Sequence, residues 1–375
     1  MTDPILSVIV PVYNGASYLE DCLKSIIEQT FRNYELICVN DGSTDRTLDI
    51  MVEYKSIDKR IAVISQENRG VSAARNVGLE LAKGRYVLFL DGDDWFEPTM
   101  FEKMVFRMDK DEADICVCSG WRFDMRFNEL VLGKSYLRAD YLPSKIPFSI
   151  SDIGKYLFNF TTFHIYKMYR LSTLKSGGVK FRSFIVSEDA LFYSEALLNA
   201  NLITVVNEPL FYYRVNSGAS ASSYVSDNIL SGYQSLLEIK KLLQNKNMYF
   251  GDLKQSFVNK ALSSTLHYGR QAVTPESFCT WFYKMRDQGG LASLDILGQD
   301  SNYFYNKKEY QKLQELVSAE GPYDLMCAYY RQAIESRDSA KSKTRSLQRR
   351  IEQIKKSKSY RLAMKFRKIA KKIKI

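Results

Sequence analysis

The first hundred residues alternate between two hydrophobic periods. Short apolar runs rich in β-branched residues occupy positions 6–12, 35–40, 60–65 and 85–90. Between them apolar residues recur at helical spacing, as in the stretch YLEDCLKSII at 18–27. Strand and helix in alternation predict right-handed crossovers, and therefore an α/β fold with a mostly parallel sheet and helices on both faces.

Beyond this region the pattern is less regular. Three more strands are predicted, at residues 114–121, 202–206 and 209–215. A short amphipathic piece is predicted near residues 152–160. A helix is predicted from Glu188 onward, with Ser187 as its N-cap.

The chain after the last strand is predicted to be helical, with one amphipathic face ending at Leu243 and a further helix near residues 253–268. We therefore expect three parts: a sheet domain over 1–225, a helical accessory region over 226–328, and an amphipathic helical tail over 329–375.

Polar residues follow four of the predicted strands, at positions 11–14, 40–43, 66–70 and 91–94. In open sheets of this kind, ligands bind beyond the carboxyl ends of the strands. Because parallel strands end at the same edge, these four segments are predicted to form a single site.

The most unusual of these segments is LFLDGDDWFEP, in which Asp91, Asp93 and Asp94 stand directly behind four apolar residues. Three neighbouring carboxylates repel one another unless a positive charge lies among them. Carboxylate oxygens favour a hard divalent cation, Mn²⁺ or Mg²⁺, held together with substrate phosphates. The alternative is a solvated Asp-Gly turn in which Asp94 caps a helix starting near Pro98.

The neighbouring strand ends add candidates for ligand binding. Asp41 could accept a hydrogen bond from a nucleobase or hold a ribose, and Arg69 and Arg75 could meet uracil or phosphate charge. The structural alternatives are an Asp-Gly-Ser turn, with Thr44 or Asp45 as an N-cap, and a capped helix with a solvated face.

The net charge of +10 is concentrated at one end of the chain. Residues 341–375 contain 15 lysines and arginines and one acid, so the remainder is mildly acidic. Apolar residues at helical spacing interleave with these charges, which is typical of a helix lying on an anionic membrane surface. A homo-oligomerisation helix is the alternative, and nucleic-acid binding is disfavoured because the globular part is acidic.

The chain also indicates a compartment. Six cysteines form no recognisable disulfide framework, and Cys116 and Cys118 are too closely spaced for a typical zinc pair. The N-terminus lacks a basic region before its apolar run, and no stretch approaches the length of a membrane-spanning helix. We expect a cytoplasmic protein that attaches to the inner face of the cell membrane.

Several spaced motifs together resemble the family 2 glycosyltransferases of bacterial cell-surface polysaccharide synthesis. They are SVIVPVYNGASYLEDCLKSIIEQTFRNYELICVNDGSTDRT, NRGVSAARNVGLELAKGRYVLFLDGDDW and SEDALF. The likeness is close over residues 5–120 and looser to about 220. It implies the GT-A fold and an inverting transfer from a nucleotide-sugar.

The resemblance implies roles for individual residues. Pro11, Tyr13 and Asp41 would hold the nucleoside, usually uridine. Asp93 would bind the metal, Asp91 the ribose or the metal, and Asp189 would be the catalytic base. A helix N-terminus favours the ionised form of Asp189. Charge pairing at the helix end is the alternative for both acids of the Glu188-Asp189 pair, and we favour it for Glu188.

Some positions depart from the family pattern or stay open. Asn216 stands where many relatives have a histidine, which makes a third protein ligand to the metal doubtful there, although Arg214 could still contact diphosphate. The role of Lys167 is open. Trp95 either flanks a sugar or packs under residues 91–94, which we call the acidic loop. His164 and His267 are expected to be packing or surface residues.

These observations predict a metal-dependent glycosyltransferase, moving a hexose or N-acetylhexosamine from a UDP-sugar to a glycan or lipid-linked acceptor. A nucleotide-sugar nucleotidyltransferase is the main alternative, but it needs a glycine-rich phosphate loop, and only Gly15 follows the first strand. A dehydrogenase lacks support for the same reason. A non-catalytic GT-A-like partner protein has no evident reason to keep four acids on one rim.

Overall fold

The computed structural model of the chain describes residues 3–162, 166–182, 187–216, 228–272, 274–335 and 337. Its strands are β1 (Leu6–Val12), β2 (Tyr34–Asp41), β3 (Ile61–Gln66), β4 (Tyr86–Phe89), β5 (Trp95–Phe96), β6 (Ile115–Asp124), β7 (Glu129–Leu132), β8 (Lys167–Arg170) and β9 (Ile203–Val215). They form one sheet in the order β3-β2-β1-β4-β8-β6-β9-β5, and β7 pairs with β6.

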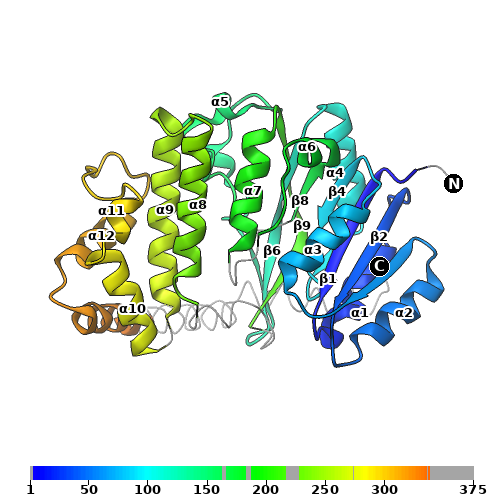
Figure 1. The fold of residues 1–375 in the computed structure, drawn as a ribbon, viewed down its shortest axis with the longest axis horizontal. Helices are drawn as coiled ribbons and strands as arrows, with labels where there is room; N and C mark the ends of the chain where they lie inside the picture. The colour runs from blue at the N-terminus through cyan, green and yellow to red at the C-terminus, as the bar shows by residue number, and fades with distance from the viewer. Residues whose placement is uncertain are drawn as a thin grey trace, which may run out of the picture. The chain divides into compact units, whose positions relative to one another are not determined.

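The helices alternate with the first strands and then dominate the chain (Figure 1). They are α1 (Ala16–Ile27), α2 (Thr47–Ile57), α3 (Val71–Leu81), α4 (Met100–Lys110), α5 (Ile150–Ile153), α6 (Leu171–Ser176), α7 (Glu188–Asn199), α8 (Ser231–Asn245), α9 (Gly251–Gln271), α10 (Pro275–Arg286), α11 (Gly290–Ser293) and α12 (Lys307–Ser318). Two short 3-10 helices, η1 (Ala139–Tyr141) and η2 (Gly154–Tyr156), lie between β7 and β8.

The sheet is parallel in its first half and mixed in its second. Strands β1 to β4 pair in parallel, as the alternation of strand and helix predicted. β8 then runs antiparallel to both β4 and β6, whereas β6 and β9 are parallel. The strands predicted at 202–206 and 209–215 form one strand, because Asn207 and Glu208 bulge outward and the register against β6 resumes at Pro209.

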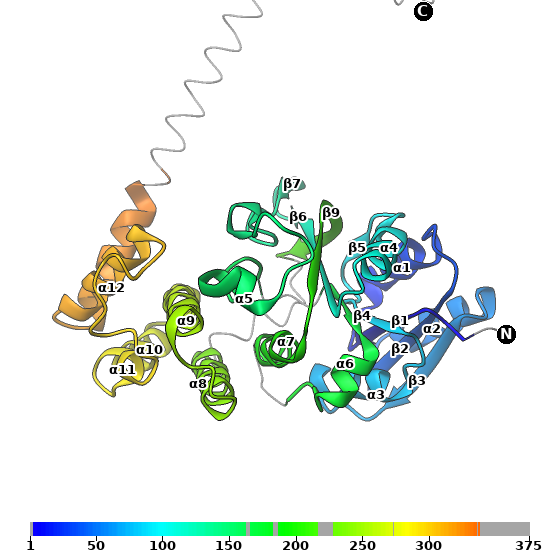
Figure 2. The ribbon, with the colours of Figure 1, turned by 90° about the horizontal axis from the view of Figure 1, so that it is seen from above.

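Helices cover both faces of the sheet, with α1 and α4 on one face and α3, α6 and α7 on the other (Figure 2). The predicted apolar stripe of α1 is buried through Leu19, Cys22, Leu23 and Ile26. α3 lies especially close to β1, because a Cβ at Gly78 would be 2.4 Å from Ile9 Cγ2. Glycine at this position therefore lets the helix rest directly on the strand.

An aromatic cluster fixes α7 against the end of β4. The Phe181 and Phe192 rings stack with their centroids 3.9 Å apart, and Phe89 meets both rings edge-on. Phe89 precedes Asp91 by two residues, and Phe192 follows Asp189 by three. Packing of these rings therefore brings the two predicted site acids toward each other.

The helices after the sheet continue from α7, with α8 beside α7 and α9 beside α8. By their internal contacts, residues 1–314 form one compact unit and residues 315–375 a second. The predicted boundary at 225/226 thus lies within the first unit and remains a prediction. None of the described helices has the length and apolar character needed to cross a bilayer. The basic tail of 341–375 and His164 lie outside the described residues.

Candidate active site

The ends of the parallel strands bring together the polar segments that the sequence singled out. Val12 of β1 is in register with Asn40 of β2, so Tyr13 and Asp41 leave adjacent strands at the same edge. The Pro11 side chain is buried in β1, whereas Tyr13 is 52% exposed and open to a ligand. The predicted rim therefore exists, and an exposed aromatic ring stands on it.

Asp41 holds the loop between β3 and α3. Its Oδ1 accepts hydrogen bonds from Gln66 Nε2 at 2.6 Å and from the Arg69 backbone N–H at 3.0 Å, and its Oδ2 accepts from the Gly70 N–H at 2.9 Å. Gly42 approaches the same loop so closely that a Cβ there would lie 2.7 Å from the Asn68 nitrogen. Asp41 thus positions Arg69, whose exposed side chain is predicted to meet the donor.

The three acids after β4 lie within one small volume. One carboxylate oxygen from each of Asp91, Asp93 and Asp94 lies within 4.8 Å of the others. Asp94 is fully buried, accepts from the Arg214 backbone N–H at 2.7 Å, and is hydrogen-bonded to the Tyr166 hydroxyl. The alternative role of Asp94 as a helix cap is wrong, because Asp94 is held inward and Thr99 precedes α4.

The other two acids are suited to hold a cation. Burial raises the pKa of Asp93 to about 6, and the neighbouring Asp91 carboxylate adds to this effect. Burial disfavours the charged form of this carboxyl, and a cation close to it would favour that form. Asp94 is buried and engaged, whereas Asp91 and Asp93 are partly exposed, so these two are the oxygen donors accessible to Mn²⁺ or Mg²⁺, and their chemistry fits either ion. Asp91 also contacts Arg75 and the Tyr166 hydroxyl.

Arg75 connects this cluster to α7. Its NH2 lies 2.9 Å from Asp91 Oδ1 and its NH1 lies 2.8 Å from Glu188 Oε1, with the arginine side chain only 5% exposed. Burial alone would lower the pKa of Arg75, but Asp91, Glu188 and Asp189 outweigh it and raise the pKa. The pairing that we favoured for Glu188 is therefore present, and its partner is the predicted donor-binding Arg75.

Asp189 follows in the first turn of α7 and is partly exposed. Burial raises its pKa to about 7, and the Glu188 carboxylate raises it further against the opposing effects of Arg75 and Lys167. The Ser187 side chain does not cap the helix as predicted, because Ser187 has a left-handed φ of 69° and its hydroxyl bonds that of Tyr268. A carboxylate that titrates near neutrality is suited to general-base catalysis.

Lys167, whose role the sequence left open, is buried beside this acid. Its Nζ donates to the Thr162 carbonyl at 2.9 Å and lies 4.4 Å from the centre of the Tyr193 ring. Burial lowers the pKa of Lys167 to about 7, although Asp189 opposes this shift. Lys167 and Asp189 thus interact electrostatically, and each favours the charged form of the other.

Arg214 and Trp95 pack together next to the acidic loop. Arg214 Nε donates to the Asp93 carbonyl at 2.8 Å, and its NH2 lies 3.2 Å from Asp21 Oδ2. The guanidinium stacks over Trp95, whose ring stacks in turn on Tyr212. Of the two roles considered for Trp95, the structure therefore has packing under the loop. A contact between Arg214 and diphosphate stays a prediction.

Several residues were missed or left open by sequence reasoning. The Tyr166 hydroxyl donates to Asp91 at 3.1 Å and also bonds Asp94, yet it lies in a segment without a clear period. Asn216 hydrogen-bonds to Asp124. His267 packs edge-on against the Tyr268 ring, as expected of a packing residue. Lys260 of α9 interacts electrostatically with Asp189 and gave no signal in the sequence.

The amino-acid sequence is similar to those of known glycosyltransferases. Residues 7–177 match the family model described as Glycosyl transferase family 2. EpsH of Bacillus subtilis, described as a "putative glycosyltransferase", is 34% identical over 252 residues, covering 66% of this chain and 71% of EpsH. Glycosyltransferase GlyA of Streptococcus pneumoniae is 34% identical over 223 residues, or 58% of this chain. The chain spans only 32% of the length of GlyA.

Two solved structures share the architecture. S. aureus TarS 1-349 in complex with UDP-GlcNAc has a TM-score of 0.52 at 23% identity, covering 82% of this chain and 91% of that one. The mannosyltransferase PcManGT of Pyrobaculum calidifontis, in complex with GDP-Man and Mn²⁺, has a TM-score of 0.50 at 14% identity, covering 87% and 86%. These similarities confirm the predicted GT-A fold.

Proposed function

The chain belongs to glycosyl transferase family 2 and is a glycosyltransferase, and from this premise we propose a metal-dependent, inverting transfer from a UDP-sugar. The acceptor is a hydroxyl of a cell-surface glycan or its lipid-linked precursor. The observation that carries the proposal is the Arg75 bridge, which joins the Asp91 carboxylate to Glu188, the residue next to Asp189 on α7.

The donor is bound along the rim of the parallel strands. Tyr13 and Asp41 flank the nucleoside, with Pro11 shaping the floor beneath it, and Arg69 and Arg75 offset phosphate charge. Asp91 and Asp93 hold Mn²⁺ or Mg²⁺, which when bound neutralises charge on the departing diphosphate. The solved complexes of TarS with UDP-GlcNAc and of PcManGT with Mn²⁺ support this reading.

Asp189 acts as the general base. Its carboxylate takes the proton of the acceptor hydroxyl while that oxygen bonds to the anomeric carbon and the bond from this carbon to the diphosphate oxygen breaks. One displacement of this kind inverts the configuration. A base with a pKa of about 7 is half ionised at neutral pH and still basic enough to accept the proton.

The alternatives are less compatible with the site. A nucleotidyltransferase needs free backbone N–H groups in a glycine-rich loop, but the Gly15 N–H already donates to Thr47 Oγ1 at 2.9 Å. A non-catalytic partner protein gains nothing from an Asp189 carboxyl whose burial raises its pKa to about 7, because a scaffold is more stable without it.

Attachment to the inner face of the cell membrane remains part of the proposal. It rests on the basic, amphipathic sequence of residues 341–375, which suits an anionic leaflet and would hold the enzyme near a lipid-linked acceptor. Homo-oligomerisation through the same segment is the alternative.

The test is a donor screen with the full chain and no acceptor. UDP-GlcNAc, UDP-glucose and GDP-mannose are each incubated with Mn²⁺, Mg²⁺ or EDTA, and release of the nucleoside diphosphate is measured. We expect slow UDP release from one UDP-sugar, only with metal, and none from Asp189→Asn. Release from GDP-mannose alone would overturn the donor assignment. Pyrophosphate release from UTP and a sugar 1-phosphate would favour the nucleotidyltransferase.

A further inference from the structure

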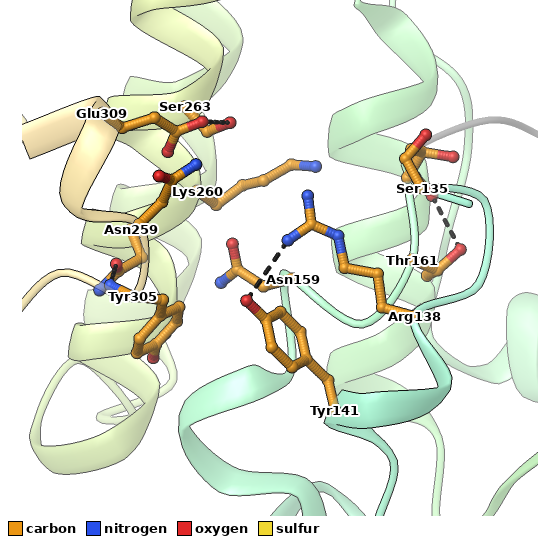
Figure 3. A pocket seen from close by; sticks show the side chains of 12 residues that line it. Ser135, Arg138, Tyr141, Asn159, Thr161, Asn259, Lys260, Ser263, Tyr305 and Glu309 are labelled. Carbon is orange, nitrogen blue, oxygen red and sulfur yellow. Dashed lines mark hydrogen bonds between the residues drawn. The ribbon is translucent and has the colours of Figure 1, made fainter. Parts of the chain in front are cut away.

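A polar pocket of about 50 Å³ lies between α9, the segments 135–141 and 159–162, and the beginning of α12 (Figure 3). Its lining contains two cationic side chains, Arg138 and Lys260, which extend from opposite walls toward the same space. We name this feature the Arg138–Lys260 pocket. None of the roles assigned above to donor, metal or base uses it.

The charge balance of the pocket is positive. Among the described residues that line it, Glu309 is the one acid, and Glu309 Oε1 accepts a hydrogen bond from Ser263 Oγ at 3.0 Å. Burial lowers the pKa of Lys260 to about 8, and the facing Arg138 lowers it further, while Asp189 and Glu309 oppose the shift. Two cations face each other here, and a bound anion would relieve their repulsion.

The walls of the pocket are held in place by hydrogen bonds. The Arg138 backbone N–H donates to the Phe160 carbonyl at 2.7 Å, and Leu137 forms a β-bridge with Thr161. Asn159 Nδ2 donates to the Ser256 carbonyl of α9 at 2.8 Å, which ties this wall to the helix bearing Lys260. The two cationic side chains therefore stand on fixed backbone, and little ordering is needed on binding.

The pocket is linked electrostatically to the proposed base. Asp189 raises the pKa of Lys260 electrostatically. On the donor side, Arg75 lowers the pKa of Asp189 and Asp91 raises it. The Thr162 carbonyl, in the pocket lining, accepts a hydrogen bond from Lys167, a buried lysine that interacts electrostatically with Asp189. A molecule bound in this pocket could thus present a hydroxyl to Asp189. The charges of Asp91 and Arg75 on the donor side also affect the pKa of this carboxyl.

We infer that the Arg138–Lys260 pocket is an acceptor subsite for an oxyanion, a phosphate or carboxylate that the acceptor glycan carries near its reacting hydroxyl. The inference rests on the proposed function. An arginine fork and a lysine ammonium that converge on one small polar space match the charge and the hydrogen-bonding geometry of an oxyanion.

Binding of small probes to the full chain tests this assignment. The protein is first saturated with UDP and Mn²⁺, so that no probe binds at the acidic loop. It is then titrated with sn-glycerol 3-phosphate and with glucuronate, and with glycerol and glucose as neutral counterparts. The variants are Arg138→Gln and Lys260→Gln, and the matched control is Arg270→Gln, an exposed arginine on the same helix.

We expect at least one anion to bind the wild type, with about tenfold or greater weakening in Arg138→Gln and Lys260→Gln, as for loss of one charge-assisted hydrogen bond. The Arg270→Gln control should keep wild-type affinity, and the anion that binds identifies the acceptor chemistry. Equal binding to all variants, equal binding of neutral probes, or no anion binding would overturn the inference.

The UDP titration that precedes the probes separates the two proposals. If UDP binds and the anions do not, the acceptor inference fails and the proposed function stands. If UDP does not bind, the donor assignment fails, and the comparison of Arg138→Gln with Arg270→Gln still decides whether the pocket takes an anion.

Discussion

The buried Arg75 side chain is ion-paired with Asp91, which follows strand β4, and Arg75 NH2 lies 2.9 Å from Asp91 Oδ1. The same guanidinium reaches Glu188 at 2.8 Å, 113 residues further along the chain. Its Nε is buried and has no hydrogen-bond partner among the described residues. One side chain from α3 therefore sets the spacing between the acidic loop and the start of α7.

Loss of this bridge should destabilise the fold. Arg75→Gln leaves two partly buried carboxylates facing each other without a counter-charge. We expect the free energy of unfolding to fall by about 3 kcal/mol, the lower end of the range for breaking a buried ion pair. Urea denaturation measures this loss, and activity should fall with it.

The control for this variant is Arg85→Gln. Arg85 pairs with Asp109 at 2.7 Å, but their side chains are 49% and 41% exposed. An exposed pair contributes about 1 kcal/mol or less, so this variant should remain close to wild type. Equal losses in the two variants would contradict the structural role of Arg75.

Asp189→Asn should separate catalysis from donor binding. The amide keeps the shape of the side chain but cannot take a proton, so we expect kcat to fall by about 10²–10⁴-fold. Affinity for UDP should stay unchanged, as measured by titration. A variant that retains wild-type kcat would exclude Asp189 as the base.

The raised pKa of Asp189 gives the reaction a defined pH dependence. The base works in its ionised form, so with a pKa of about 7 the rate should rise with pH and level off above pH 7. Below that value kcat/KM should fall by about tenfold per pH unit. UDP release followed from pH 5.5 to 8.5 measures the profile, and a flat profile across this range would refute the assignment.

Asp41 should control the order of the β3–α3 loop. Asp41→Ala removes the acceptor of three hydrogen bonds, two of them from the Arg69 and Gly70 backbone N–H groups. We expect a loss of about 1–3 kcal/mol in unfolding free energy. Hydrogen exchange should show faster exchange of the Arg69 and Gly70 amides. Unchanged protection there would mean that another contact holds the loop.

The sequence predicted the parallel half of the sheet, β1 to β4, because the local hydrophobic pattern there matches the strands and helices of the structure. β1 to β4 alternate with helices, and β1, β2 and β4 are almost entirely buried, so apolar runs located the four strands within about two residues. The acids at their ends also fell where predicted, because parallel strands end at one edge. β8 and β5 were not predicted, since strands of four and two residues carry too little periodicity.

The contacts that assemble the site could not be read from the sequence. The Arg75–Glu188 pair and the Tyr166–Asp94 hydrogen bond join segments over 70 residues apart, and no local pattern encodes such partners. Ser187 had the residue type of an N-cap, but its hydroxyl bonds Tyr268 of α9 instead. Tertiary contacts thus overrode a local preference at the turn that presents Asp189.

Metal-dependent donor binding is the central claim, and calorimetric titration with UDP tests it most directly. Wild type and Asp93→Ala are each titrated with UDP in the presence and absence of Mn²⁺. We expect UDP to bind the wild type tightly only with Mn²⁺, and Asp93→Ala to lose this dependence together with the affinity. Equal UDP binding by both proteins, with or without Mn²⁺, would contradict it.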